Sequence, residues 1–132
     1  MVLTGLVWGL IIPATPFPRL ALVAHVQFES DGILIIVLAL LLLVLPHQVG
    51  PKSLGAMLLT VWLTWAMALS EVANAWWGTN QILPIAARQA GATGGAAWLE
   101  LILKLTHMGA GLALIVAWTL LVVGFARKNN RA

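Results

Sequence analysis

The sequence predicts an all-α integral membrane protein, organised as a four-helix bundle in a single transmembrane domain over residues 1–132. The first observation is the composition: 61% of the 132 residues are hydrophobic and 8% are charged, against about 25% charged in an average soluble domain. Seven basic and four acidic side chains are too few to cover a water-facing surface on a chain of this size. The solvent of this protein is therefore the lipid bilayer.

The second observation is a set of four apolar segments, at residues 2–18, 20–45, 53–77 and 98–125. A membrane-crossing helix needs about 20 mostly apolar residues. The first segment contains Pro13 and Pro16, which kink or end a helix. No Lys or Arg precedes Arg19, so this segment lacks the basic start of a signal peptide and is expected to be a helix.

The other three segments have clearer boundaries. The second has no polar residue over 33–45 and ends at Pro46, which cannot continue a helix. The third follows the turn-like residues 47–51, and the fourth follows a loop rich in glycine and alanine at 91–95. Each of the three is therefore expected to span the bilayer.

The basic residues predict the orientation in the membrane. Four crossings put both termini and the loop at Lys52 on one side. That side also carries the basic residues of the C-terminal tail, Arg127, Lys128 and Arg131. Arg19 and Arg88 fall on the opposite side. Cytoplasmic segments carry the excess of Lys and Arg, so we expect a multi-pass protein with both termini in the cytoplasm. The net charge of +3 comes from these few residues, and nucleic acid is not an expected partner.

Several chemistries are excluded. The chain has no cysteine, which removes disulfides, thiolate metal sites and cysteine nucleophiles. It also has no glycine-rich phosphate loop, no Gly-x-Ser-x-Gly turn and no His-Glu-x-x-His pair. An ionisable group inside a membrane helix costs about 3 kcal/mol or more, so the polar residues within the apolar segments are the functional candidates.

The densest polar group lies near the start of the second segment. At about 100° per residue, His25, Glu29 and Gly32 form one stripe of a helix, while Asp31 lies about 120° round from His25. Gly32 leaves room for a close backbone or a flat cofactor, and a neutral imidazole such as His25 is a common iron or zinc ligand. The alternative is that these residues are interfacial first turns, where carboxylates contact water.

The third segment carries a second polar stripe. By i, i+4, i+7 spacing, Thr64, Ala68 and Glu71 share one face, which places a hydroxyl and a carboxyl on the inside of the bundle. The alternative for the hydroxyl groups is bonding to the backbone or to a neighbouring helix. Trp62 and Trp65 are expected to line an apolar pocket that suits an aromatic ring.

The fourth segment carries three ionisable residues at the same spacing. Glu100 precedes Lys104 by four residues, which is the favourable order for an ion pair. His107 is a second candidate metal ligand.

Four stretches of the chain resemble one family of small membrane isomerases. They are GLIIP at 9–13, PRLALVAH at 18–25, DG at 31–32 and WGTNQILPIA at 77–86. They are similar to hydroxylaminobenzene mutase and, more distantly, to styrene oxide isomerase, four-helix membrane proteins with Ala-His, five intervening residues and Asn-Gly on the second helix. The resemblance covers most of the chain, with the fourth segment matching in hydropathy only.

The resemblance implies a cofactor and an assembly. In the styrene oxide isomerase branch, the histidine of this motif is the axial ligand of a b-type haem (heme b) held between the protomers of a homotrimer. By position, His25 is then the ligand of the haem iron, with Gly32 beside the cofactor. Asp31 takes the place of a pocket asparagine, Thr64 that of an asparagine on the third helix, and Ala68 that of a tyrosine.

The resemblance also implies an activity. The mutase branch is the nearer match because the chain has no tyrosine, and a mutase rearranges a small aromatic hydroxylamine to an aminophenol. Asp31, Thr64 and Glu71 are the expected catalytic residues. The alternative is an epoxide isomerase of the styrene oxide type that forms an aldehyde. Alternatives of another class are a haem b electron-transfer protein with His107 as second ligand, and a structural membrane subunit.

Overall fold

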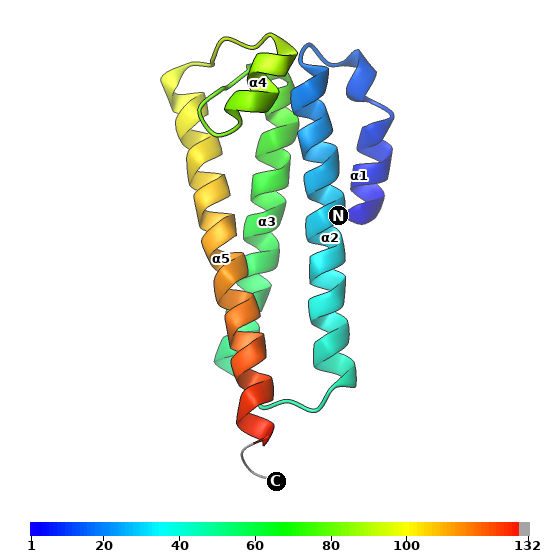
Figure 1. The fold of residues 1–132 in the computed structure, drawn as a ribbon, viewed down its shortest axis with the longest axis vertical. Helices are drawn as coiled ribbons and strands as arrows, with labels where there is room; N and C mark the ends of the chain where they lie inside the picture. The colour runs from blue at the N-terminus through cyan, green and yellow to red at the C-terminus, as the bar shows by residue number, and fades with distance from the viewer. Residues whose placement is uncertain (130–132) are drawn as a thin grey trace.

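Three long helices run side by side along the length of the molecule (Figure 1). The computed structural model describes the backbone of residues 1–129 and the side chains as far as Arg127. In chain order the elements are α1 (Val2–Gly9), a 3-10 turn η1 (Ile12–Ala14), α2 (Pro18–Val44), α3 (Pro51–Trp77), α4 (Pro84–Ala90) and α5 (Ala97–Asn129). Within this described part, α2, α3 and α5 are long and apolar enough to cross a membrane. The protein is all-α, and the three long apolar helices indicate a multi-pass membrane protein.

Proline and glycine define the helix ends. α2, α3 and α4 each begin with proline in the first turn, where a backbone N–H is not needed. α3 and α4 are each followed by a glycine in the left-handed region, Gly78 at φ +61° and Gly91 at φ +72°. The three long helices therefore lie within a few residues of the segments predicted at 20–45, 53–77 and 98–125.

The first predicted crossing, at 2–18, is not one helix. α1 has 8 residues, about 12 Å at 1.5 Å per residue, which is less than half of a hydrocarbon core of about 30 Å. Its end at Gly9 follows from Pro13, because a proline ring clashes with the carbonyl four residues earlier. The prediction of four spanning helices is corrected to three within the described residues, with α1 packed beside α2.

The ends of the chain differ from the predicted topology. The loop 45–50 and the end of α5 meet at one end of the bundle, where Gln48 N donates to Gly124 O at 3.0 Å. The start of α1 instead lies beside the middle of α2, because a Cβ added at Gly32 would be 2.6 Å from Val2 Cγ2 (Figure 1). The shared side expected for both termini therefore holds only for the C-terminal end and the Lys52 loop. Arg131 lies outside the described residues.

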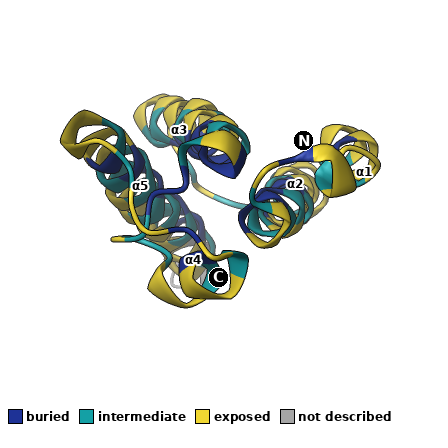
Figure 2. Ribbon diagram, turned by 90° about the horizontal axis from the view of Figure 1, so that it is seen from above, coloured by how far each residue is buried: buried dark blue, intermediate teal, exposed yellow. Residues whose placement is uncertain are grey.

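The packing leaves one side of the bundle less closed than the others. α3 packs against both α2 and α5, whereas α2 and α5 contact each other little. Figure 2 shows these helices at the corners of a triangle, with α4 across the side between α2 and α5. On the far side of α2, Trp8 packs on Ala21 and Ala24 and donates its Nε1–H to Ala21 O at 2.8 Å. Small side chains thus bring α1 close to α2.

The half of the bundle near residues 45–50 is closed by side chains that are apolar apart from Thr60. These side chains are Leu34, Ile35, Leu38, Met57, Thr60, Val61, Leu114 and Trp118, around a cavity of about 10 Å³. A cavity of this size has no room for a ligand. This point of the interior, between α2, α3 and α5, therefore holds no ligand.

Gly78→Ala is expected to destabilise the protein by about 2 kcal/mol or more, because a side chain in the left-handed region costs about 1–2 kcal/mol and the new Cβ would lie 2.6 Å from Phe17 Cε2. Gly91→Ala is the matched control, since its φ is also positive but no atom lies within 4 Å of the added Cβ. Thermal unfolding of both purified variants in one detergent measures the difference. Equal destabilisation would contradict the contact with Phe17.

Candidate functional site

Polar side chains from three helices meet inside the bundle. Thr64 and Ala68 are fully buried and Glu71 is 1% exposed, which confirms the predicted inner stripe of α3. Asp31 of α2 is also buried and accepts a hydrogen bond from Gln27 Nε2 at 2.9 Å. The charges of Glu71 and His107 act on Asp31 across the bundle. We call Asp31, Glu71 and His107 the polar layer.

Glu71 and His107 join α3 to α5. His107 Nδ1 donates to Leu103 O at 2.8 Å, and Nε2 forms a hydrogen bond with Glu71 Oε1. A carbonyl oxygen can only accept, so Nδ1 carries a hydrogen. The contact between Nε2 and Oε1 then contains one proton, which belongs either to the imidazole or to the carboxyl group. The pair thus consists of a buried acid and a half-buried base that share a proton.

The second oxygen of Glu71 has a different environment. Oε2 is buried and has no hydrogen-bond partner among the residues that the structure describes. A buried acceptor without a partner costs about 1–3 kcal/mol, so such groups are rare in folded proteins and are typical of functional sites. Glu71 therefore offers one free acceptor to the inside of the bundle.

The sequence patterns did not predict this pair. The spacing predicts Glu71 on the inner stripe of its own segment, whereas it indicates His107 only as a second candidate metal ligand. Periodicity locates a residue on a face but does not say which residue of another helix lies opposite. One feature of the sequence does suggest the contact. Glu71 lies toward the C-terminal end of α3 and His107 lies in the N-terminal half of α5, and these are the parts of the two helices that the intervening loop joins.

His25 lies on the opposite face of α2, against α1. Its Nδ1 is 2.8 Å from Gly5 O, and its Nε2 is 3.6 Å from Glu29 Oε1, beyond hydrogen-bond contact. The ring packs on Gly9, where an added Cβ would be 3.1 Å from Cε1. His25 and Asp31 therefore point to different faces of α2, as the helical angles predicted.

Only one of the three histidines has an available ring nitrogen. His47 Nε2 is bonded to Leu42 O at 3.0 Å, and its Nδ1 accepts the Val49 N–H at 3.2 Å. Both nitrogens of His107 are also bonded. In His25, Nδ1 donates to a backbone carbonyl, so Nε2 keeps its lone pair in the neutral form. That second hydrogen bond is typical of an imidazole that binds a metal through the other nitrogen.

Two expected site residues have local partners instead. Gly32 lies against Val2 of α1 and also lines a cavity of about 340 Å³, so α1 occupies only part of the space expected beside a cofactor. Thr64 Oγ1 donates to Val61 O at 2.9 Å and lies 4.0 Å from Met1 Sδ. The expected aromatic pocket is formed in part: Trp65 lines the same cavity, between α1, α2 and α3, whereas Trp62 is 67% exposed and is not among its lining residues.

Glu100 has a structural role that the sequence did not predict. Instead of pairing with Lys104, its carboxylate accepts backbone N–H groups from the two loops on either side of α4. These donors are Asn80 at 2.8 Å, Gln81 at 3.1 Å and Gly95 at 3.3 Å. Bonds to a charged acceptor contribute about 1.5–3 kcal/mol each, so Glu100 holds the loop that carries α4 in place.

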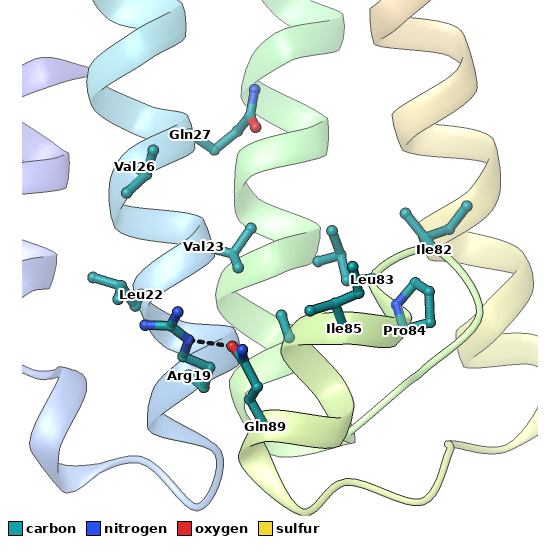
Figure 3. A pocket seen from close by; sticks show the side chains of 11 residues that line it. Arg19, Leu22, Val23, Val26, Gln27, Ile82, Leu83, Pro84, Ile85 and Gln89 are labelled. Carbon is teal, nitrogen blue, oxygen red and sulfur yellow. Dashed lines mark hydrogen bonds between the residues drawn. The ribbon is translucent and has the colours of Figure 1, made fainter.

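A groove of about 480 Å³ lies between α2 and α4, and Figure 3 shows its lining. Arg19 Nε donates to Gln89 Oε1 at 2.7 Å at one end, and Gln27 lies at the other (Figure 3). The wall between them consists of apolar side chains from α2 and from residues 82–86. Gln27 lines the groove and also donates to Asp31, so this side chain connects the groove with the polar layer. Its volume suits a small molecule.

A metal ion bound by the protein alone does not fit this geometry. Within the described residues, no group of three or more His, Cys, Asp or Glu side chains is arranged to hold one. A haem iron needs fewer ligands from the protein, because the porphyrin supplies most of them and one protein side chain is enough. The donor set around His25 fits that demand.

Compared with protein-family models, with curated proteins and with solved structures, the chain shows no significant match. The family resemblance and the activity that it implies are therefore taken up below as a proposal.

Glu71→Ala is expected to destabilise the protein by about 1–3 kcal/mol, because it leaves the half-buried His107 without its partner. Glu71→Gln is expected to cost much less, since the amide N–H can donate to His107 Nε2. Thermal unfolding in one detergent compares the two variants. Ser70→Ala is a useful reference, because it removes a neighbouring α3–α5 hydrogen bond, to Thr106 at 2.8 Å, which is worth about 0.6 kcal/mol in a membrane. A Glu71→Ala effect no larger than this reference would contradict a buried ion pair.

Proposed function

We propose that this protein is a haem-dependent membrane isomerase that rearranges a small aromatic hydroxylamine to an aminophenol. The observation that carries the proposal is the state of His25, whose Nδ1 is bonded to Gly5 O while its Nε2 has no hydrogen bond. A metal-binding imidazole requires this arrangement. The family resemblance over residues 18–32 supports the same histidine.

His25 would be the residue of this chain that holds haem b. When bound, a ferric haem supplies a Lewis acid that polarises the N–O bond of the substrate. His47 and His107 have both ring nitrogens in hydrogen bonds, so neither is available as a second ligand. An electron-transfer haem normally has both axial positions filled, which makes the electron-transfer alternative less favourable.

The homotrimer that the resemblance implies is part of the proposal. The His25 side chain is 23% exposed on the outer side of the α1–α2 pair. A cofactor at this position would therefore need a second surface beyond the single chain. A neighbouring copy would supply that surface and exclude water from it.

Asp31 would act on the substrate as a carboxylate. An ionised carboxylate accepts hydrogen bonds and cannot donate them. It therefore stabilises the electron-poor nitrogen or ring that forms as the N–O bond weakens. The Gln27 amide, which donates to Asp31 Oδ2, orients the carboxylate. Thr64 donates its hydroxyl proton to Val61 O, so its oxygen is left as an acceptor for a substrate N–H.

The same carboxylate makes an epoxide a poorer substrate. Opening an epoxide develops negative charge on oxygen, and an ionised Asp31 would repel that charge where an amide would donate to it. A hydroxylamine passes through a cation-like ring instead. The charge of Asp31 therefore favours the mutase reaction over the epoxide isomerase reaction.

His25→Ala is expected to lose haem while still inserting into the membrane, because insertion depends on the apolar helices. Absorbance of the purified, detergent-solubilised variant at the Soret band measures the loss. His47→Ala is the matched control and is expected to keep full haem content. A full Soret band in His25→Ala would show that His25 does not bind the haem. Loss of the band in His107→Ala, with His25 intact, would assign the haem to α5 instead.

Asp31→Asn is expected to lower turnover of an aryl hydroxylamine by about 10²-fold, to affect turnover of a styrene-type epoxide less, and to leave haem content unchanged. The physical reason is the loss of the negative charge near the electron-poor nitrogen. Steady-state assays on both substrates, with haem quantified by absorbance, measure the effect. Unaltered turnover of both substrates would show that Asp31 has no catalytic role.

A further inference from the structure

We propose that Glu71 and His107 act together as the acid–base pair that moves one proton during the rearrangement. This role rests on the proposed mutase function, and it assigns a second catalytic group on the opposite side of the bundle from α2. Two observations support it: the hydrogen bond between the two side chains, which contains one proton, and the Glu71 Oε2 that has no hydrogen-bond partner among the described residues.

The reaction itself requires a proton to move. When an aryl hydroxylamine becomes an aminophenol, the N–O bond breaks and a C–O bond forms at the ring. The ring carbon that receives oxygen loses its proton, and the nitrogen gains one. Nothing else is added or removed, so one group that takes the proton from carbon and returns it to nitrogen completes the isomerisation without a co-reactant.

The geometry of the pair suits both halves of this transfer. Glu71 Oε2 is buried without a partner and is free to accept the proton from the ring carbon. The proton already between Oε1 and His107 then resides on the imidazole, whose Nδ1–H remains bonded to Leu103 O. The pair becomes positively charged in this state. An ionised Asp31 on the facing helix α2 would compensate for that charge.

The other carboxyl groups of the chain are less suitable. There are four acidic residues in all. Glu100 accepts three backbone N–H groups, and Glu29 lies beside His25 on the outer face with 31% of its side chain exposed. Asp31 is bonded to Gln27 and stabilises positive charge in its ionised form. Glu71 is the acidic residue that combines burial, a free oxygen and a basic partner.

The test uses Glu71→Gln and His107→Gln in the full-length, haem-loaded protein, with phenylhydroxylamine carrying either hydrogen or deuterium on the ring. Each variant is expected to lower turnover by about 10²-fold or more and to raise the deuterium isotope effect, because proton removal from carbon becomes rate-limiting. Haem content is expected to stay unchanged. The double variant is expected to be no slower than the slower single variant, since the two residues act as one unit.

The neighbouring pair Ser70 and Thr106 supplies the matched control. Their hydroxyl groups join the same two helices at 2.8 Å, one residue away from Glu71 and His107. Ser70→Ala and Thr106→Ala are expected to keep the wild-type turnover and isotope effect, although each removes an α3–α5 contact. If the control variants also show slow turnover and a raised isotope effect, the Glu71–His107 pair acts only by packing α3 against α5, and the proton-transfer role is wrong.

Two further outcomes separate this inference from the proposed function. An active wild-type protein whose Glu71→Gln variant keeps its turnover and its isotope effect would overturn the proton-transfer role alone. A haem-containing wild-type protein that converts no aryl hydroxylamine would overturn the proposed function and this role together.

Discussion

The rest of the structure depends on one constraint, which is that a bilayer offers no water to a polar group inside it. Each polar side chain of the described helices therefore has to be bonded within the protein or be held there for a function. Ser70 and Thr106 satisfy one another, and Thr64 and Thr60 bond back to their own helix. Glu71 and His107 also satisfy one another, in this case as an acid and a base. The position of these groups determines which faces of α3 and α5 can meet.

α2 differs from the other long helices because it carries polar residues on two faces. His25 is oriented by α1 and faces outward, whereas Asp31 faces the interior with Glu71 and His107. The two faces of α2 present different chemical groups. One presents a nitrogen lone pair at the edge of the chain, and the other presents carboxyl groups in a dry interior below the groove and above a closely packed apolar half.

Much of this arrangement can be predicted from the sequence. Hydropathy and proline locate the three long helices, and helical angles place Thr64 and Glu71 on an inner stripe and His25 and Asp31 on different faces. The prediction of a helix over 2–18 is wrong, although the sequence contains the cause of the short α1: the ring of Pro13 clashes with the carbonyl of Gly9 and ends the helix there. Contacts between elements could not be predicted, because the partners of Glu71 and Glu100 lie on other segments and no periodicity within one helix encodes them.

α1 has a consequence for how the protein is made. Eight residues are too few to cross the bilayer on their own, and the surface that α1 binds belongs to α2, which is synthesised after it. Glycine at position 5 lets the two helices approach closely, since an added Cβ would be 2.9 Å from Phe28 Cβ. The carbonyl that orients His25 therefore reaches the imidazole only after α2 has been inserted and α1 has docked. The orientation of the His25 ring therefore depends on a contact between α1 and α2, and a chain in which α1 has not docked does not hold the ring in place.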